Sequence, residues 1–283
     1  MKFVMFAKHL QEWPLEKAAR VVKSLGFDGI DLTVRGGGYV LPENVERDLP
    51  EAPKVIAEAG LEVPMLTTNI TDVTQDHSEA VIATAARCGV RELKYGYHTY
   101  KKFGEFKALC ERARQEIGAA AKVAGEHGVR LNLHIHSNNF VTANAAVVAW
   151  LLQDIEPATA GAYIDPGHMT IEGGVDLWRQ GLELLADRTN LMAVKSMGHF
   201  FEPDGSRAGR WTNRMVPLQR GMVDWVKVWQ CLDQFGYDGV VSLHSEYQGG
   251  HSWRDLTIDE VVDQTREDFA YLKACRDKAR SAV

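Results

Sequence analysis

Short apolar runs alternate with longer amphipathic stretches along the chain. The short runs are typical of strands buried in a parallel sheet, and they begin near Lys2, Gly29, Glu62, Glu92, Arg130, Gly161, Leu191 and Val240. The longer stretches predict helices near Leu15–Leu25, Ala52–Ala59, Ser78–Cys88, Phe106–His127, Ala143–Gln153, Leu177–Ala186, Trp225–Phe235 and Ile258–Lys278. Eight alternations with no break in composition predict an α/β fold, a single (β/α)8 TIM barrel that spans residues 1–283 as one domain.

Glycines mark the junctions between several of these helices and the strands that follow. The phrase LGFDGI at residues 25–30 returns as FGYDGV at 235–240, and weaker copies stand at 59–63, 88–92 and 127–131. We expect Gly26 and Gly236 to close their helices in the left-handed conformation, which glycine adopts without steric cost.

The runner-up fold is an open, doubly wound sheet that binds a nucleotide. It would need a phosphate-binding motif, and neither GxGxxG nor GxxxxGK[ST] follows the first strand. Instead, the chain carries a long segment after its seventh strand, Ser196–Met222, in which we predict only a loop. Its arginines are Arg207, Arg210, Arg214 and Arg220. A loop at this place would cover the barrel mouth, where Arg210 and Arg214 would bind an anionic or heavily hydroxylated ligand.

Composition narrows the class of protein further. A hydrophobic fraction of 45% over 283 residues allows one large core, and a net charge of −6 argues against a nucleic-acid-binding face. The N-terminal apolar run is too short for a signal peptide, and no run approaches the roughly 20 apolar residues of a membrane span. The four cysteines are scattered without a CxxC pair, which favours reduced thiols in a cytoplasmic protein. The composition is compatible with either a monomer or a homo-oligomer.

Side chains of catalytic type follow three of the expected strands, and they are His134, His136, Asp165, His168, His244 and Glu246. Residues i and i+2 of a strand point the same way, so His134 with His136, and His244 with Glu246, would each project as a pair. In barrel enzymes the carboxyl ends of the strands build the active site. We therefore expect an active site at this face.

Neighbouring strand ends add further candidates. Lys195 ends the seventh strand, where it would either pair with a carboxylate or stabilise an enolate. Arg35 stands in a glycine-rich loop and could clamp an anion, while Tyr97 could stack on the face of a sugar. The remaining loop candidates are Lys8, His9, Asn69 and His98.

These motifs resemble the sugar phosphate isomerase/epimerase family of xylose-isomerase-like TIM barrels, and the resemblance covers the whole chain. The motifs that carry the resemblance are YIDPGH at residues 163–168, Lys195, and PLQRGMVD at 217–224. The chain resembles one subgroup of the family more closely, at DLTVR (31–35) and SLHSEY (242–247). The resemblance implies proton abstraction next to the carbonyl of a sugar, keto-sugar or cyclitol. Such a step ends in isomerisation, epimerisation, or β-elimination or hydration of a 3-keto-sugar.

The resemblance also implies a divalent metal ion, held by glutamate, aspartate, histidine and glutamate from strands five to eight. At those places this chain has His134, Asp165, Ala193 and His244, with Glu246 two residues after the last. Ala193 cannot bind a metal, so the chain departs from the family's two-glutamate proton shuttle. His134, Asp165, His244 and Glu246 could still form a mixed nitrogen and oxygen set, which suits Mn²⁺, Zn²⁺, Co²⁺ or Ni²⁺ better than Mg²⁺.

The residue types then suggest a division of roles. Glu246 or His136 would be the base, and Lys195, with any metal, would stabilise the oxyanion. His168 and Arg35 would orient hydroxyls of a small-molecule carbohydrate; no nucleic acid or membrane partner is expected. The missing histidine on strand seven favours elimination or hydration over plain epimerisation. The alternative is a catalytically silent sugar-binding barrel, whereas a metal-dependent DNA-repair nuclease would need more ligands and a basic face.

Overall fold

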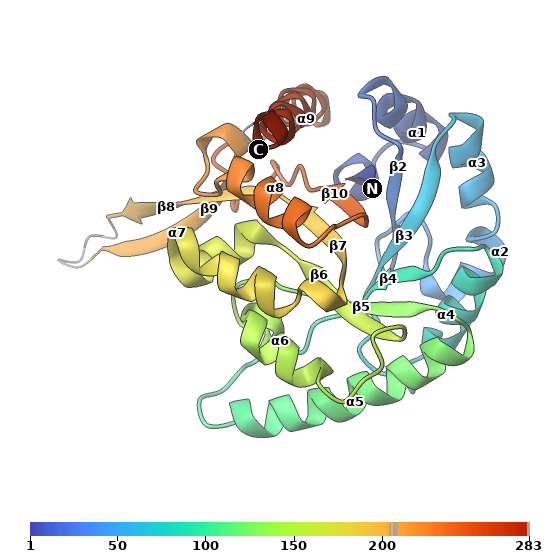
Figure 1. Cartoon of the computed structure of the whole chain (residues 1–283). Helices are drawn as coiled ribbons and strands as arrows, with labels where there is room; N and C mark the ends of the chain where they lie inside the picture. The colour runs from blue at the N-terminus through green and yellow to red at the C-terminus, as the bar shows by residue number, and fades with distance from the viewer. Residues whose placement is uncertain (204, 206–208, 282–283) are drawn as a thin grey trace.

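The computed structural model describes residues 1–203, 205 and 209–281 (Figure 1). Eight parallel strands close into a barrel in the order β1-β10-β7-β6-β5-β4-β3-β2. They are β1 (Lys2–Phe6), β2 (Gly29–Val34), β3 (Glu62–Thr68), β4 (Glu92–Lys94), β5 (Arg130–His134), β6 (Ala160–Ile164), β7 (Thr189–Val194) and β10 (Val240–Leu243). The predicted (β/α)8 TIM barrel is confirmed, and the largest shift in a strand start is β7, at Thr189 instead of Leu191.

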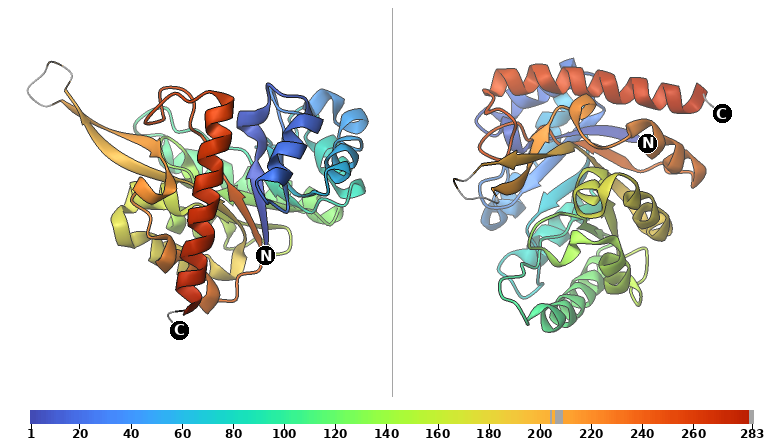
Figure 2. Two further views of the ribbon diagram at one scale, coloured as in Figure 1. Left: turned by 90° about the horizontal axis from the view of Figure 1, so that it is seen from above. Right: turned by 90° about the vertical axis from the view of Figure 1, so that its left-hand side faces the viewer.

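Helices wrap the outside of the barrel (Figure 2). They are α1 (Leu15–Ser24), α2 (Val45–Asp48), α3 (Ala52–Glu58), α4 (Ser78–Arg87), α5 (Phe106–Glu126), α6 (Ala145–Leu152), α7 (Pro166–Leu184), α8 (Trp225–Gln234) and α9 (Ile258–Ser281). The last helix lies against the first strand, where the rings of Phe269 and Phe3 are 5.5 Å apart. No helix of the described chain is long and apolar enough to cross a membrane.

Helix α7 begins earlier than the sequence pattern predicts. It starts at Pro166, directly after β6, instead of near Leu177. The side chain of Asp165 caps its first turn by accepting a hydrogen bond from the backbone N–H of His168 at 3.1 Å, and proline is well suited to the first helical position. Gly174, with φ 77°, interrupts the helical geometry. That interruption breaks the period of the helix, so its N-terminal half was not predicted.

The segment Ser196–Met222 is not the loop that the sequence predicts. It contains strands β8 (Ser196–Glu202) and β9 (Arg210–Val216), which pair antiparallel from Ser196↔Val216 to Glu202↔Arg210. This ribbon projects from the body of the barrel (Figure 1). Its strands are rich in aromatic and β-branched residues, which favour extended pairing over an open loop. Arg207 lies outside the described residues.

The junction glycines behave as predicted. Gly26 has φ 90° and Gly236 has φ 68°, and the glycines of the three weaker copies also have positive φ. The four cysteines are all free thiols: Cys88, Cys110, Cys231 and Cys275. Inside the barrel a small apolar cluster that includes Met65, Tyr163 and Ala193 fills the centre below the mouth. The polar side chains at the mouth therefore lie above a layer of packed apolar side chains.

Candidate active site

The carboxyl ends of the strands enclose a cavity of about 150 Å³ at the barrel mouth. Ala193 belongs to the buried floor, so Lys195, two residues further along, points to the same interior side one layer higher. The cavity is lined by Phe6, Lys8, Arg35, Thr67, Lys94, Tyr97, His134, His136, Tyr163, Lys195, His244 and Glu246. The structure thus brings together most of the side chains that the sequence singled out.

Lys195 lies at the centre of this group. Its Nζ is 3.3 Å from Oδ2 of Asp165 and 3.1 Å from Oε2 of Glu246. The Lys195 side chain is 1% exposed, Asp165 is fully buried, and Glu246 is 14% exposed. Lys8 approaches the other oxygen of Glu246 at 3.1 Å. Two carboxylates therefore share a buried ammonium, and one of them has a second cation at its outer side.

The charges of these groups stabilise one another. Burial alone would lower the pKa of Lys195, but the attraction of Asp165 and Glu246 outweighs it, and the net pKa is raised. Burial alone would raise the pKa of Glu246, but Lys195 and the other cations hold it well below its usual range. At neutral pH the site therefore contains a fixed ammonium and an ionised carboxylate.

His134 extends this network towards Tyr97. Its Nε2 is 3.0 Å from Oδ2 of Asp165 and its Nδ1 is 2.7 Å from the hydroxyl of Tyr97. Because the carboxylate only accepts, Nε2 carries the proton and Nδ1 accepts from Tyr97. Burial and the nearby Lys195 keep the pKa of His134 well below its usual value, so this imidazole is neutral.

His136 is among the residues that line the cavity. Its Nδ1 donates to the carbonyl of Ser137 at 2.9 Å, which leaves Nε2 as the acceptor of the neutral ring. Burial, aided by the charge of Lys195, lowers the pKa of His136 to about 4. His168 stacks behind it with ring centroids 3.7 Å apart, and its Nδ1 meets the hydroxyl of Ser137 at 2.7 Å. His168 is not among the residues that line the cavity, and its Nε2 lies 3.8 Å from Oδ2 of Asp165, so its predicted contact with substrate stays a prediction.

The four predicted metal ligands do not converge on one point. His244 turns its Nε2 to the hydroxyl of Tyr163 at 2.8 Å, and its ring stacks on Phe6. Within the described residues, no cluster of three or more histidine, cysteine, aspartate or glutamate side chains could hold a metal ion. The ammonium of Lys195 takes the place between Asp165 and Glu246 where a divalent ion would bind. A second positive charge there would be repelled, so these residues do not fit the metal that the resemblance implies.

The predicted substrate-binding residues fall into two groups. Arg35 and Tyr97 line the cavity. Arg210 is on the projecting ribbon, where its guanidinium donates to Oε2 of Glu202 at 3.0 Å, and Arg214 pairs with the same carboxylate. Neither ribbon arginine is part of the cavity lining. We therefore expect Arg210→Ala to leave KM unchanged, contrary to the prediction from sequence.

Two buried charged residues were missed by sequence reasoning. Lys94 lines the cavity from β4, and Asp31 lies within the barrel, where its carboxylate accepts from the hydroxyls of Thr67 at 2.7 Å and Ser242 at 2.9 Å. Asp31 interrupts the apolar run of β2, and that interruption was the available signal. Lys94 ends the three-residue strand β4, which gives no comparable signal.

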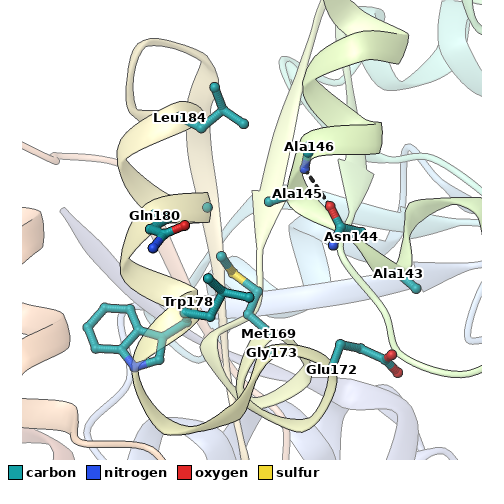
Figure 3. A pocket seen from close by; sticks show the side chains of 12 residues that line it. Ala143, Asn144, Ala145, Ala146, Met169, Glu172, Gly173, Trp178, Gln180 and Leu184 are labelled. Atoms are coloured by element: carbon teal, nitrogen blue, oxygen red, sulfur yellow. Dashed lines mark hydrogen bonds between the residues drawn. The ribbon is translucent and has the colours of Figure 1, made fainter.

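A second cavity lies between α6 and α7 and has a different character (Figure 3). Alanines, Met169, Trp178 and the amides of Asn144 and Gln180 line it, and its lining includes no histidine or lysine. Its single carboxylate, Glu172, accepts from the backbone N–H of Asn138 at 3.2 Å. It offers no proton-transfer group beside a cation, and the mouth of the barrel is therefore the candidate active site.

The buried histidines predict a loss of stability in acid. Burial lowers the pKa values of His134, His136, His168 and His244 in the folded chain. Below the unfolded value of about 6.5 the unfolded chain therefore binds more protons, and the free energy of unfolding falls as the pH drops from 6.5 towards 4. The raised pKa values of Asp31, about 7, and of Asp268, about 6, act in the opposite direction, but the four histidines outnumber them. Urea unfolding at pH 7.5, 6 and 5 measures this loss of stability, and equal unfolding midpoints at the three pH values would contradict the prediction.

Solved structures of the same fold include two sugar epimerases and a magnesium complex of a xylose isomerase-like barrel. An L-ribulose 3-epimerase is 18% identical with a TM-score of 0.75, covering 99% of this chain and 96% of its own. The 3-keto-D-glucoside 4-epimerase YcjR from E. coli is 16% identical with a TM-score of 0.70, covering 97% and 100%. A barrel from Mycobacterium smegmatis, solved in complex with magnesium, is 15% identical with a TM-score of 0.68, covering 97% of both chains. At these identities the likeness shows the fold.

The family follows from a match over most of the sequence. Residues 19–275 match the family described as xylose isomerase-like TIM barrel. This match agrees with the closed barrel and with a site built at the carboxyl ends of its strands. The chain belongs to the xylose isomerase-like TIM-barrel family.

Proposed function

We propose that this chain, as one domain, is an isomerase/epimerase-like enzyme that abstracts the proton next to the carbonyl of a keto-sugar. The observation that carries the proposal is Lys195, buried between Asp165 and Glu246 at the barrel mouth. An ammonium fixed beside the site can stabilise the negative charge that develops on the carbonyl oxygen of an enolate. The similar epimerases act on sugars with such carbonyl chemistry, which supports the same substrate class here.

Two proton-transfer groups flank Lys195 in the order of the strands. Glu246 follows β10 on one side of β7, and His136 follows β5 on the other side, beyond β6. Glu246 is the base in this proposal, because it is ionised at neutral pH and lines the cavity. His136 offers its free Nε2 to the substrate from the other side. After Glu246 has removed the proton, its carboxyl group holds that proton and can return it to a neighbouring carbon or oxygen or pass it to a departing hydroxyl, while the neutral Nε2 of His136 accepts a hydrogen bond from a substrate hydroxyl. Isomerisation, epimerisation and elimination share the first step.

No divalent ion is needed in this proposal, because the ammonium of Lys195 supplies the positive charge. Dialysis against EDTA is expected to leave the exchange activity unchanged, and added Mn²⁺, Zn²⁺ or Co²⁺ should raise it by less than about twofold, since a site filled by a cation repels another. Loss of activity with EDTA and recovery with one ion would instead support the metal-assisted enzyme that the sequence predicts.

The test of the proposal is solvent hydrogen exchange. Wild-type protein is incubated in D₂O with ketohexoses and 3-keto-glycosides, and NMR follows the hydrogen next to the carbonyl. Exchange faster than the buffer reaction supports an enolate-forming enzyme; the product spectrum then separates isomerisation, epimerisation and elimination. Binding of these sugars without any exchange would favour the catalytically silent sugar-binding barrel.

A further inference from the structure

The cavity contains more cations than its carboxylates can balance. Its lining includes Lys8, Arg35, Lys94 and Lys195 but a single carboxylate, Glu246. Glu246 pairs with Lys8 and Lys195. Within the described residues Arg35 and Lys94 form no close ion pair, and the carboxylate that attracts both of them is the buried Asp31. Two basic side chains at the mouth are therefore left without an ion-pair partner.

Lys94 is the more unusual of the two. Its side chain is 2% exposed, and its Nζ has one long hydrogen bond, 3.4 Å to the carbonyl of Thr68. The Nζ also lies 3.6 Å from the centroid of the Tyr97 ring. An ammonium has three donors, and burying a charge with unused donors is unfavourable. A role in folding alone does not account for a lysine at this position.

Asp31 is the nearest alternative counter-ion, and it is poorly suited to that role. Its oxygens already accept from Thr67 and Ser242, and burial raises its pKa to about 7. Both oxygens of this carboxyl are therefore engaged by hydroxyl donors instead of the two basic side chains. An anion from solution would satisfy them better.

The position of these two cations in the barrel also points to a ligand. Arg35 follows β2 and Lys94 ends β4, the two strands beside β3. In the closed order of eight strands, β3 lies opposite β7, which carries Lys195. A small molecule that spans the mouth would thus meet Lys195 with one end and the two free cations with the other.

We propose that Arg35 and Lys94 form a subsite for an anionic group of the substrate, either a carboxylate or a phosphate ester. Arg35 offers a planar fork of donors and Lys94 a buried point charge, a combination that suits both groups. The substrate is then an anionic keto-sugar, a conclusion that rests on the proposed function. Burial, and then repulsion by Arg35, hold the pKa of Lys94 well below its usual value, so a bound anion should promote proton uptake by the complex.

Binding of inorganic phosphate tests the subsite without any reaction. Titration calorimetry at constant ionic strength compares the wild type with Lys94→Met, Arg35→Gln and the control Arg210→Gln, which removes an exposed arginine of the ribbon. Charge-assisted hydrogen bonds of this kind correspond to about 10- to 100-fold in affinity, so each subsite variant should raise the Kd by that factor while the control leaves it unchanged. Equal affinity in all four proteins, or no phosphate binding to the wild type, would overturn the subsite.

The melting temperature of Lys94→Met separates an anion subsite from a structural lysine. Because the substitution removes a buried ammonium without a counter-ion, we expect the melting temperature to stay equal or rise. A large fall would assign Lys94 to the fold and overturn its role as a ligand group. Arg35→Gln, at a partly exposed position, provides the independent measurement of phosphate affinity if Lys94→Met does not fold.

Exchange in D₂O then tests the substrate class. The probes are 5-keto-D-gluconate, D-fructose 6-phosphate and the neutral D-fructose. An anionic probe should exchange at least about tenfold faster at low concentration, and Arg35→Gln should remove this preference mainly through KM. Equal rates for all three probes, or a borohydride-reducible adduct on Lys94, would overturn the inference. Phosphate binding that depends on Arg35 and Lys94, without exchange of any probe, would support the subsite and reject the proposed reaction.

Discussion

Glu246→Gln is expected to slow deuterium exchange next to the carbonyl of a keto-sugar by about 10²–10⁴-fold, the usual effect of removing a general base. The amide keeps the size and shape of the carboxylate but cannot accept the proton. Because Glu246 is mostly buried between Lys195 and Lys8, its loss also leaves two cations without their partner. NMR rates of exchange and kcat for the same substrate measure the effect.

The matched control is Glu202→Gln, which removes a carboxylate from the projecting ribbon and should leave exchange unchanged. Thermal unfolding of both variants separates loss of the base from loss of the fold. If Glu246→Gln still exchanges at the wild-type rate while His136→Asn does not, His136 is the base. Its pKa of about 4 would then appear as the acid limb of kcat/KM.

The barrel and the core of its site follow from simple rules of strand geometry. The alternation of short apolar runs with amphipathic helices predicts the fold because the helix after each parallel strand packs on the outer face of the sheet. The i, i+2 rule places His134 with His136 and His244 with Glu246, and all four line the mouth. Lys195 could be predicted as a site residue for the same reason.

The partner of each side chain could not be predicted from the sequence. His244 and Glu246 share a strand side, yet His244 binds Tyr163 while Glu246 binds Lys195. Such differences depend on rotamers and on neighbours from strands far away in the chain. Lys94 was missed because it ends a strand of three residues, too short for any period, and its role emerges only from the cations around it.

The two strands of the ribbon after β7 could not be predicted from the sequence either. Its residues look like a loop with scattered glycines, but the pairing of β8 with β9 joins positions that the sequence does not relate. Arg210 was predicted to meet the substrate because loops after barrel strands close the mouth. In the structure β8 and β9 pair with each other, and Arg210 and Arg214 both form ion pairs with Glu202 of the same ribbon. The charges of the two arginines are therefore balanced within the ribbon.

Lys195→Ala is expected to reduce kcat by about 10²–10³-fold, as for other lost oxyanion stabilisers, and to convert the site into one that binds a divalent ion. Oδ2 of Asp165 and Oε2 of Glu246 would both lose their ammonium, and Nε2 of His134 lies 3.0 Å from Oδ2 of Asp165. If these side chains move together and His134 gives up its Nε2 proton, they form a mixed set that suits Zn²⁺ or Mn²⁺. Removing one partner of a buried ion pair costs about 3–5 kcal/mol, so the apo variant should melt earlier than the wild type.

Added Zn²⁺ or Mn²⁺ should restore much of that stability in Lys195→Ala by binding only the folded state, while the wild type should not respond. Lys8→Met is the matched control, because it removes a partly exposed ammonium from the same Glu246 but leaves Lys195 in place; it should neither lose much stability nor gain a metal site. Elemental analysis and melting curves with and without the ion measure both effects. A wild type that retains one equivalent of metal after purification, or a Lys195→Ala variant that binds none, would show that the ammonium does not stand in for a divalent ion in this barrel.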